Sequence, residues 1–181
     1  MTDDLPVCTV DDPFMRAAYD VALEGYRSGG IPIGAVIVYR GEIIGRGHNS
    51  RFQRSNPILH GEMTAFENAG RQPAEVYRES TLYTTHSPCT MCAGTTLLFG
   101  VPRLVIGEEI HSRRNTNYLG SGKLPSEFLR SIGMEVTVHD DLACYEILER
   151  FAHEKPDVWA EDIGVTVPEL MDMLADPAFK P

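Results

Sequence analysis

Apolar positions near the start of the chain change from a spacing typical of helices to one typical of strands. After Asp11-Asp12-Pro13, an acidic cap with proline at the first helical position, apolar residues from Phe14 to Ala22 recur three and four positions apart. This spacing predicts a helix that ends at Ser28-Gly29-Gly30. The apolar run from Ile33 to Tyr39 and the segment from Glu42 to Arg46 then predict an antiparallel hairpin.

The rest of the chain alternates between predicted helices and strands. In order, the pattern predicts a polar loop (Asn49 to Asn56), a helix (Asn56-Pro57 to Ala69), a strand (Thr81 to Thr85), a helix (Ser87-Pro88 to before Gly100), a strand (Arg103 to Gly107), a helix (Ser126 to Ile132), a strand (Met134 to His139) and a helix (Asp140-Asp141 to about Lys155). Strands separated by helices become parallel neighbours through right-handed crossovers. With the hairpin they predict an α/β fold, a three-layer α/β/α sandwich around a five-stranded mixed sheet.

The length of 181 residues suits a single domain with a well-formed core. We expect residues 1–164 to form this domain and residues 165–181 to form a C-terminal tail. Within the tail, Pro168 to Leu174 predicts two turns of helix, to which the sequence assigns no role.

Charge and hydropathy limit the partners that the protein can have. Lys and Arg number 16 against 26 Asp and Glu, so the net charge of −10 repels phosphate backbones, and the longest basic cluster is only Arg113-Arg114. No apolar run approaches the roughly 18 residues of a membrane span. The acidic start, Met1-Thr2-Asp3-Asp4, lacks the pattern of a signal peptide. We therefore expect neither a nucleic acid nor a membrane partner, and a cytoplasmic location.

Two short motifs carry the candidate chemistry, His60-Gly61-Glu62 and Pro88-Cys89-Thr90-Met91-Cys92. Cysteines three positions apart share one helix face, so Cys89 and Cys92 can bind one metal ion. His60 would supply the third ligand, and His86 is the only other candidate nearby. Three protein ligands leave one tetrahedral position open, which is typical of a catalytic zinc. The motifs predict one Zn²⁺ per chain.

Glu62 is the candidate general acid and base. It lies two residues after His60, about 200° around a helix, so both can face a metal only if the ion lies off the N-terminal end of the helix. The same holds for Cys89, which follows Ser87-Pro88. Two helix N-termini pointing at one spot would each supply about half a positive charge, which favours thiolates.

Each motif taken alone is also compatible with a different role. A lone Cys-x-x-Cys in a reducing compartment can be a redox pair or half of a structural zinc site, although a structural site needs a fourth ligand and the sequence has no second pair. His-x-Glu alone arises by chance in many helices. The two motifs together, each at a helix start, favour a catalytic centre.

These motifs resemble the zinc-dependent nucleobase deaminases, whose pattern is His-x-Glu followed by Pro-Cys-x-x-Cys. The likeness extends to the fungal-type cytosine deaminases and covers about Pro13 to Gly164. The segments that carry it are Gly29-Gly30-Ile31-Pro32-Ile33-Gly34, Gly45-Arg46-Gly47-His48-Asn49, Leu59-His60-Gly61-Glu62, Leu82-Tyr83-Thr84-Thr85, Ser87-Pro88-Cys89 and Trp159-Ala160-Glu161-Asp162-Ile163-Gly164. The resemblance implies a cytidine deaminase-like fold, a role in pyrimidine salvage and a homodimer.

The resemblance also implies roles for single residues. Glu62 would carry protons from the attacking water to the ring nitrogen and the leaving amine, while His60, Cys89 and Cys92 hold zinc. The substrate-binding residues would be Asn49 through its amide, Gly61 through its backbone, the Ser87 carbonyl and Asp162 at the departing amino group, Trp159 as a cover, and Ile33. Asn49 could instead be a turn residue, Asp162 a helix cap and Trp159 ordinary core.

The sequence departs from the resembled pattern at the pocket wall. Where that family places an aromatic ring that stacks on the base, alignment through Ile106-Gly107-Glu108 puts Ser112, with His111 beside it. Losing a stacking ring forfeits about 1–3 kcal/mol unless His111 replaces it. His86 also stands where the family is apolar. Ser112 and His111 are therefore candidate substrate-binding residues that affect the choice of base.

The leading functional hypothesis is hydrolytic deamination of a free nucleobase, cytosine to uracil with release of ammonia. The alternative is deamination of another small amino-heterocycle, namely guanine, isocytosine, adenine or creatinine, which Ser112 and His86 motivate. A tRNA-editing deaminase and a non-enzymatic zinc-stabilised interaction module are the remaining hypotheses. The acidic charge argues against a tRNA substrate.

Overall fold

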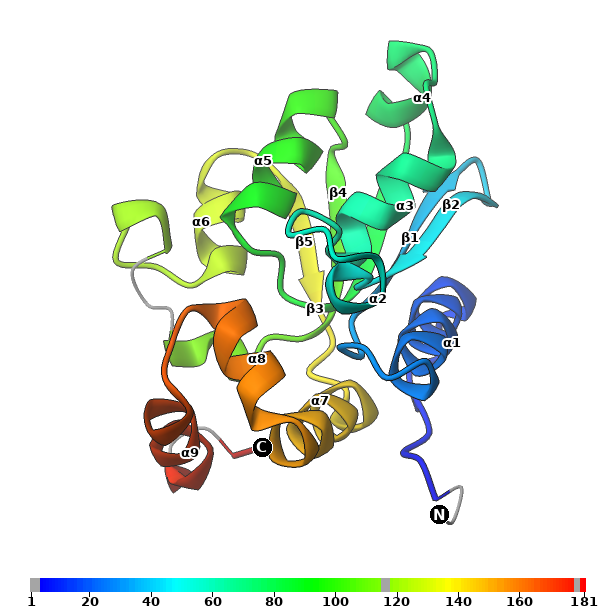
Figure 1. The fold of residues 1–181 in the computed structure, drawn as a ribbon. Coiled ribbons are helices and arrows are strands. Elements are labelled where there is room, and N and C mark those ends of the chain that lie inside the picture. The colour runs from blue at the N-terminus through cyan, green and yellow to red at the C-terminus, as the bar shows by residue number, and fades with distance from the viewer. Residues whose placement is uncertain (1–3, 115–117, 178–179) are drawn as a thin grey trace.

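A computed structural model describes residues 4–114, 118–177 and 180–181, and it confirms the predicted three-layer α/β/α sandwich (Figure 1). The strands are β1 Gly34–Tyr39, β2 Glu42–His48, β3 Thr81–His86, β4 Arg103–Glu108 and β5 Glu135–Val138. The helices are α1 Pro13–Arg27, α2 Arg51–Arg54, α3 Gly61–Ala69, α4 Ala74–Arg78, α5 Thr90–Phe99, α6 Pro125–Ser131, α7 Leu142–Glu154, α8 Pro156–Ile163 and α9 Val167–Ala175, with short 3₁₀ turns at His111–Arg114 and Tyr118–Gly120. The first three residues of the acidic start lie outside the described residues.

The sheet has the strand order β2-β1-β3-β4-β5 and is mixed, as predicted. β1 pairs antiparallel with both β2 and β3, whereas β3, β4 and β5 run parallel. Because the carboxyl ends of β3 and β4 lie side by side, the loops that follow them open at the same edge of the sheet. Residues 86–90 and 109–112 therefore meet at that edge.

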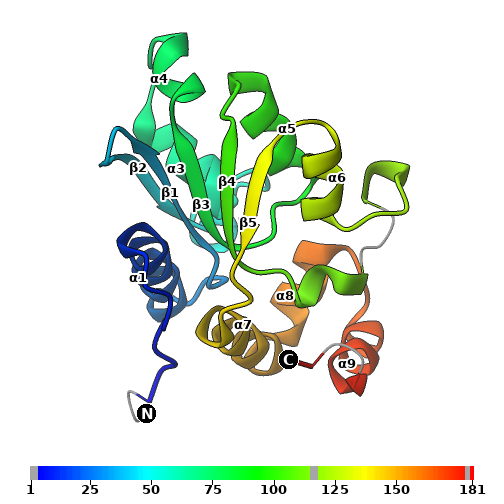
Figure 2. The ribbon, with the colours of Figure 1, turned by 180° about the vertical axis from the view of Figure 1, so that it is seen from behind.

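Alternate residues of β1 pack against different helix layers, as a strand covered on both faces requires. Ala35 and Ile37 belong to the core beneath α3, α5 and α6, and Val36 and Val38 pack against α1 on the opposite face. α7 lies beside α1 on this second face (Figure 2).

The structure corrects two predicted helix starts. α3 begins at Gly61 and not at Pro57, because the Asn56 side chain accepts a hydrogen bond from the Ile58 amide and forms a turn. α5 begins at Thr90, three residues after Ser87. The expected polar loop after Asn49 contains the short helix α2. These shifts move His60 and Cys89 from within the first turn to the N-cap positions.

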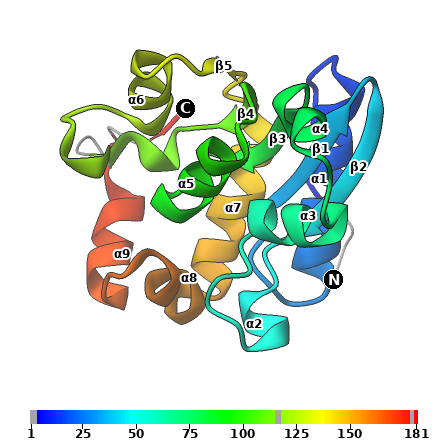
Figure 3. The same ribbon diagram turned by 90° about the horizontal axis from the view of Figure 1, so that it is seen from above.

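The C-terminal segment contains two short helices that pack beside α7 (Figure 3). Leu170 and Leu174 of α9 are buried in one cluster with Trp159 of α8 and Phe151 of α7. The Thr166 side chain caps α9 together with Glu169, which fixes where this helix starts. Residues 167–175 thus extend the core that the rest of the chain forms. Among the described residues, no helix is long and apolar enough to cross a bilayer.

Candidate metal and base-binding site

Two helix N-termini meet at the candidate metal site. His60 is the N-cap of α3 and Cys89 the N-cap of α5, both in extended backbone conformation and neither with a side-chain capping hydrogen bond. Their side chains are therefore free to point off the helix ends toward each other. Cys92 lies one turn further along α5 and is fully buried.

The three donor atoms have the separations that a tetrahedral zinc requires. Cys89 Sγ lies 3.5 Å from His60 Nδ1 and 3.7 Å from Cys92 Sγ, and all three donors lie within 4.8 Å of one another. Bond lengths of about 2.3 Å to sulfur and 2.0 Å to nitrogen put tetrahedral ligands about 3.8 Å (S–S) and 3.5 Å (S–N) apart. The donor set therefore fits zinc with one open position. His60 Nε2 lies 4.0 Å from Asp162 Oδ1, which also contacts Arg51.

Electrostatics favour a thiolate beside a carboxyl that can hold a proton. Hydrogen bonding to Cys92 lowers the pKa of Cys89 to about 4 against the effect of burial, and His60 adds to the lowering. Burial raises the pKa of Glu62, and the Cys89 thiolate raises it further. A buried carboxyl with a raised pKa holds a proton more readily than an exposed one, which suits a group that must accept and return a proton.

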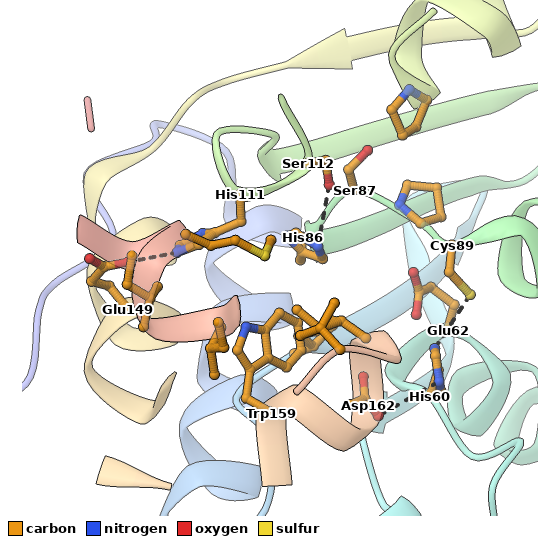
Figure 4. A pocket seen from close by; sticks show the side chains of 18 residues that line it. His60, Glu62, His86, Ser87, Cys89, His111, Ser112, Glu149, Trp159 and Asp162 are labelled. Atoms are coloured by element: carbon orange, nitrogen blue, oxygen red, sulfur yellow. Dashed lines mark hydrogen bonds and ion pairs between the residues drawn. The ribbon is translucent and has the colours of Figure 1, made fainter. Parts of the chain in front are cut away.

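Glu62 lines an elongated cavity of about 530 Å³. Figure 4 shows His60, Glu62 and Cys89 at one end and His111 and Glu149 at the other. Besides these, the lining residues come from β3, from the loops after β3 and β4, and from the two C-terminal helices: Ile33, His86, Ser87, Pro88, Ser112, Pro125, Trp159, Asp162, Ile163, Val165, Leu170, Met173 and Leu174.

The structure brings most of the sequence-predicted site residues to this cavity. The members that line it are His60, Glu62, Cys89, Ile33, Ser87, Trp159, Asp162, His111 and Ser112. Gly61 is needed for close packing, because a Cβ there would lie 2.8 Å from the Ile33 carbonyl oxygen. Asn49 is buried and is not among the residues that line the cavity. Its Oδ1 accepts from the Arg51 amide in a turn, and its Nδ2 has no hydrogen-bond partner among the described residues. An amide donor without a partner is available to a ligand.

The structure shows the surroundings of the residues for which the sequence left a purely structural role open. Trp159 is both core and cavity wall. Asp162 lies in the last turn of α8, not at a cap, and forms an ion pair with Arg51. The Ser87 hydroxyl donates to Glu109, which leaves the carbonyl as the group that Ser87 can offer.

Sequence reasoning missed a buried charge network behind the cavity wall. Glu108, fully buried, contacts Nδ1 of both His86 and His111, and His111 Nε2 lies 3.1 Å from Glu149. The His111 ring also stacks on Tyr145, with centroids 4.6 Å apart. Glu108 and His111 are three residues apart, but the contacts with His86, Glu149 and Tyr145 join residues far apart in sequence, so no local signal marks the network.

The network shifts the pKa values of its members. Although burial opposes both shifts, the two histidines hold the pKa of Glu108 well below its ordinary value, and Glu108 and Glu149 raise the pKa of His111 to about 9. His111 is therefore a cation between two carboxylates at neutral pH, and both its ring nitrogens are already engaged.

Comparisons with known proteins assign this site to a family. Residues 9–108, more than half of the chain, match the cytidine and deoxycytidylate deaminase zinc-binding region. The chain is 45% identical over 155 residues to a cytosine deaminase of Candida albicans, covering 85% of this chain and 97% of that one. A tRNA-specific adenosine deaminase of Streptococcus pyogenes is 41% identical over 96 residues, covering 52% and 60%. A solved structure from studies of tRNA:A34 deaminases has a TM-score of 0.59 at 25% identity, covering 75% and 98%.

The charge network predicts a pH-dependent stability. His111→Gln removes the cation and leaves Glu108 buried, so we expect the free energy of unfolding to fall by about 3–5 kcal/mol at neutral pH. Since the folded pKa of His111 is raised to about 9, its stabilisation is complete below the ordinary histidine pKa of about 6.5 and is lost as pH rises through about 9. Urea unfolding of both proteins across this range measures the difference.

The control is His153→Gln, since His153 is half exposed and lies 3.7 Å from Glu149. We expect that change to cost less than about 1 kcal/mol. A deficit of the His111 variant that stays constant up to about pH 10 would contradict the assigned charge state.

Proposed function

Because the chain belongs to the cytidine and deoxycytidylate deaminase family of zinc-binding proteins, we propose that it hydrolytically deaminates a free nucleobase, with cytosine as substrate and uracil and ammonia as products. The observation that carries this proposal is the triad of His60, Cys89 and Cys92 at zinc-ligand separations, with the buried Glu62 beside it. The identity of 45% to a cytosine deaminase supports the choice of base.

Glu62 is the proton carrier of the proposed reaction. When bound by His60, Cys89 and Cys92, zinc lowers the pKa of a coordinated water from 15.7 to about 7 and so supplies the nucleophile. The Glu62 carboxylate takes one proton from the attacking water and delivers it to the ring nitrogen. It then takes the second proton from the hydroxyl group that has been added to the ring carbon and delivers it to the amine, which leaves as ammonia as the C–N bond breaks and the C=O bond forms. Its pKa, which burial raises, makes the carboxyl a better proton acceptor than an exposed glutamate.

The remaining site residues hold the base against Glu62. Asn49 offers the Nδ2 donor along the ring edge, and the amide of Gly61, the first residue of α3, where a helix supplies no partner of its own, donates to the ring carbonyl. The Ser87 carbonyl and Asp162 accept hydrogen bonds from the departing amine. Trp159 covers one ring face from α8.

A second candidate substrate is another small amino-heterocycle, which the polar side chains of His86 and Ser112 in the cavity wall favour. A tRNA substrate is disfavoured by the net charge of −10. It is also disfavoured by the cover that α8 and α9 form over the cavity, because a polymer needs an open path to the site. Residues 165–174, whose Val165, Leu170 and Met173 line the cavity, are in our proposal part of the substrate site.

We expect the protein to act as a homodimer in the cytoplasm, within pyrimidine salvage. Leu97, Leu98 and Phe99 at the end of α5 are exposed, and Leu98 is 80% accessible. A hollow lined by Ile58, Met63 and Phe99, together with polar residues, lies next to them. Exposed apolar side chains that lie together are typical of a protein–protein interface.

Glu62→Gln tests the reaction. The amide cannot carry a proton, so kcat for ammonia release from cytosine should fall by at least about 10²- to 10⁴-fold while bound zinc stays at one per chain. Glu67→Gln, on the exposed side of the same helix, should leave both kcat and the zinc content unchanged. Deaminase activity that survives in Glu62→Gln would refute the role of Glu62.

The choice of substrate is tested on the purified wild-type protein. Faster release of ammonia from guanine, isocytosine, adenine or creatinine than from cytosine would refute cytosine as the substrate.

Leu98→Asp tests the dimer. A charge among the exposed apolar residues Leu97, Leu98 and Phe99 should convert the dimer to a monomer. Light scattering at micromolar concentration measures the mass. Leu142→Asp is the matched control, since Leu142 is also exposed but lies at the start of α7. A wild-type protein with the mass of one chain, 20.1 kDa, would contradict the proposal.

A further inference from the structure

The cavity is longer than a single-ring base requires. Its volume of about 530 Å³ lies in the range of about 300–1,000 Å³ that accepts drug-sized ligands. Glu62 and the metal donors occupy one end, and the cavity continues past Ser87 to Glu149 (Figure 4). A cytosine ring held at Glu62 therefore leaves the second half unfilled.

The wall of this second half presents two polar groups together. His86, the last residue of β3, and Ser112, in the loop after β4, both line the cavity, and Ser112 Oγ lies 3.4 Å from His86 Nε2. Figure 4 shows the two side chains facing each other across this short gap. Leu170 and Leu174 supply apolar surface nearby. An apolar lining with a small number of placed polar groups is typical of a recognition subsite.

Glu108 determines what His86 offers to the cavity. The His86 Nδ1–H donates to Glu108 Oε1, and an ionised carboxylate can only accept, so in the neutral ring Nε2 is the acceptor. Glu108 is fully buried, and it is held in turn by the His111 amide at 3.1 Å and by His111 Nδ1 at 3.2 Å. Trp159 contacts the His86 ring edge-on, with centroids 6.2 Å apart. The His86 ring is thus fixed with Nε2 next to Ser112 in the cavity wall, and in the neutral ring this atom accepts a hydrogen bond.

The same three side chains could in principle hold a metal ion, because the donor atoms of His86, Glu108 and His111 lie within 4.8 Å of one another. The contacts favour the hydrogen-bonded network. His86 Nδ1 and Glu108 are already in direct contact, and an ion between them would have to push them apart. His111 Nε2 is also already hydrogen-bonded to Glu149.

We propose that His86 and Ser112 form a subsite that accepts a hydrogen bond from a hydroxyl or amino substituent on the base. The substrate class is a cytosine-type ring that carries a donor of hydroxymethyl size on the carbon next to the amine-bearing carbon. A substituent there starts nearest the reacting end and extends along the wall past Ser87 to His86. This inference rests on the proposed deaminase function.

The experiment compares kcat/KM for cytosine, 5-methylcytosine and 5-hydroxymethylcytosine. The methyl compound has nearly the same shape without the donor, so the hydroxymethyl compound should be preferred over it by about tenfold, the effect of one hydrogen bond. In His86→Asn, the amide nitrogen replaces Nδ1 and can still donate to Glu108, but Nε2 is gone, and the preference should fall to about one. Ser112→Ala should reduce it in part. His139→Asn, at an exposed histidine that does not line the cavity, should keep it.

The ratio is measured within each variant, so differences in folding yield cancel. Equal rates for the methyl and hydroxymethyl compounds in the wild type, or a ratio that His86→Asn leaves unchanged, would overturn the subsite while the deaminase function stands. Failure to deaminate any cytosine-type ring would overturn both the subsite and the deaminase function.

Two other outcomes would show a different occupant. A preference for cytidine would assign the second half of the cavity to a sugar. A second metal ion per chain that is lost in His86→Asn would assign the cluster to an ion, and either result overturns the proposal.

Discussion

The site depends on the meeting of two helix N-termini at one point. Because α3 and α5 both begin at the edge of the sheet, their N-cap residues His60 and Cys89 face each other, and Cys92 reaches the same point from one turn inside α5. The partial positive charge of both helix ends stabilises the thiolate form there. Glu62 and the Gly61 amide follow directly after His60, so one short segment supplies a metal ligand and, in the proposed reaction, also the proton carrier and a hydrogen-bond donor to the base.

The C-terminal helices turn this reactive edge into a cavity. α8 carries Asp162, which pairs with Arg51 and lies near the free nitrogen of His60. The same contact joins the cover of the cavity to the loop that follows Asn49. α9 adds an apolar wall through Leu170 and Leu174. The size of the substrate is therefore limited by residues that lie far from the metal ligands in sequence.

The architecture and the metal site could be predicted because their signals are local. Cysteines three apart share a helix face at any helix start, and strands alternating with helices leave few topologies. The predicted start of α3 is wrong, since an Asn-Pro pair marks a turn as well as a helix cap, and here the Asn56 side chain bonds two residues ahead. The network of His86, Glu108 and His111 could not be predicted, because no pattern reports which side chains meet across a sheet edge. The capping box at Thr166 and Glu169 signals α9, but an amphipathic helix alone does not reveal which surface it covers.

The proposed chemistry requires that three side chains hold one zinc ion and leave one position for solvent. X-ray absorption at the zinc edge, on purified active protein of known metal content, measures this coordination. We expect one zinc per chain, bonded to two sulfur atoms at about 2.3 Å and to two lighter atoms at about 2.0 Å, one of them an imidazole nitrogen and the other exchangeable. Active protein without stoichiometric zinc, or a zinc ion with four protein ligands, would contradict it.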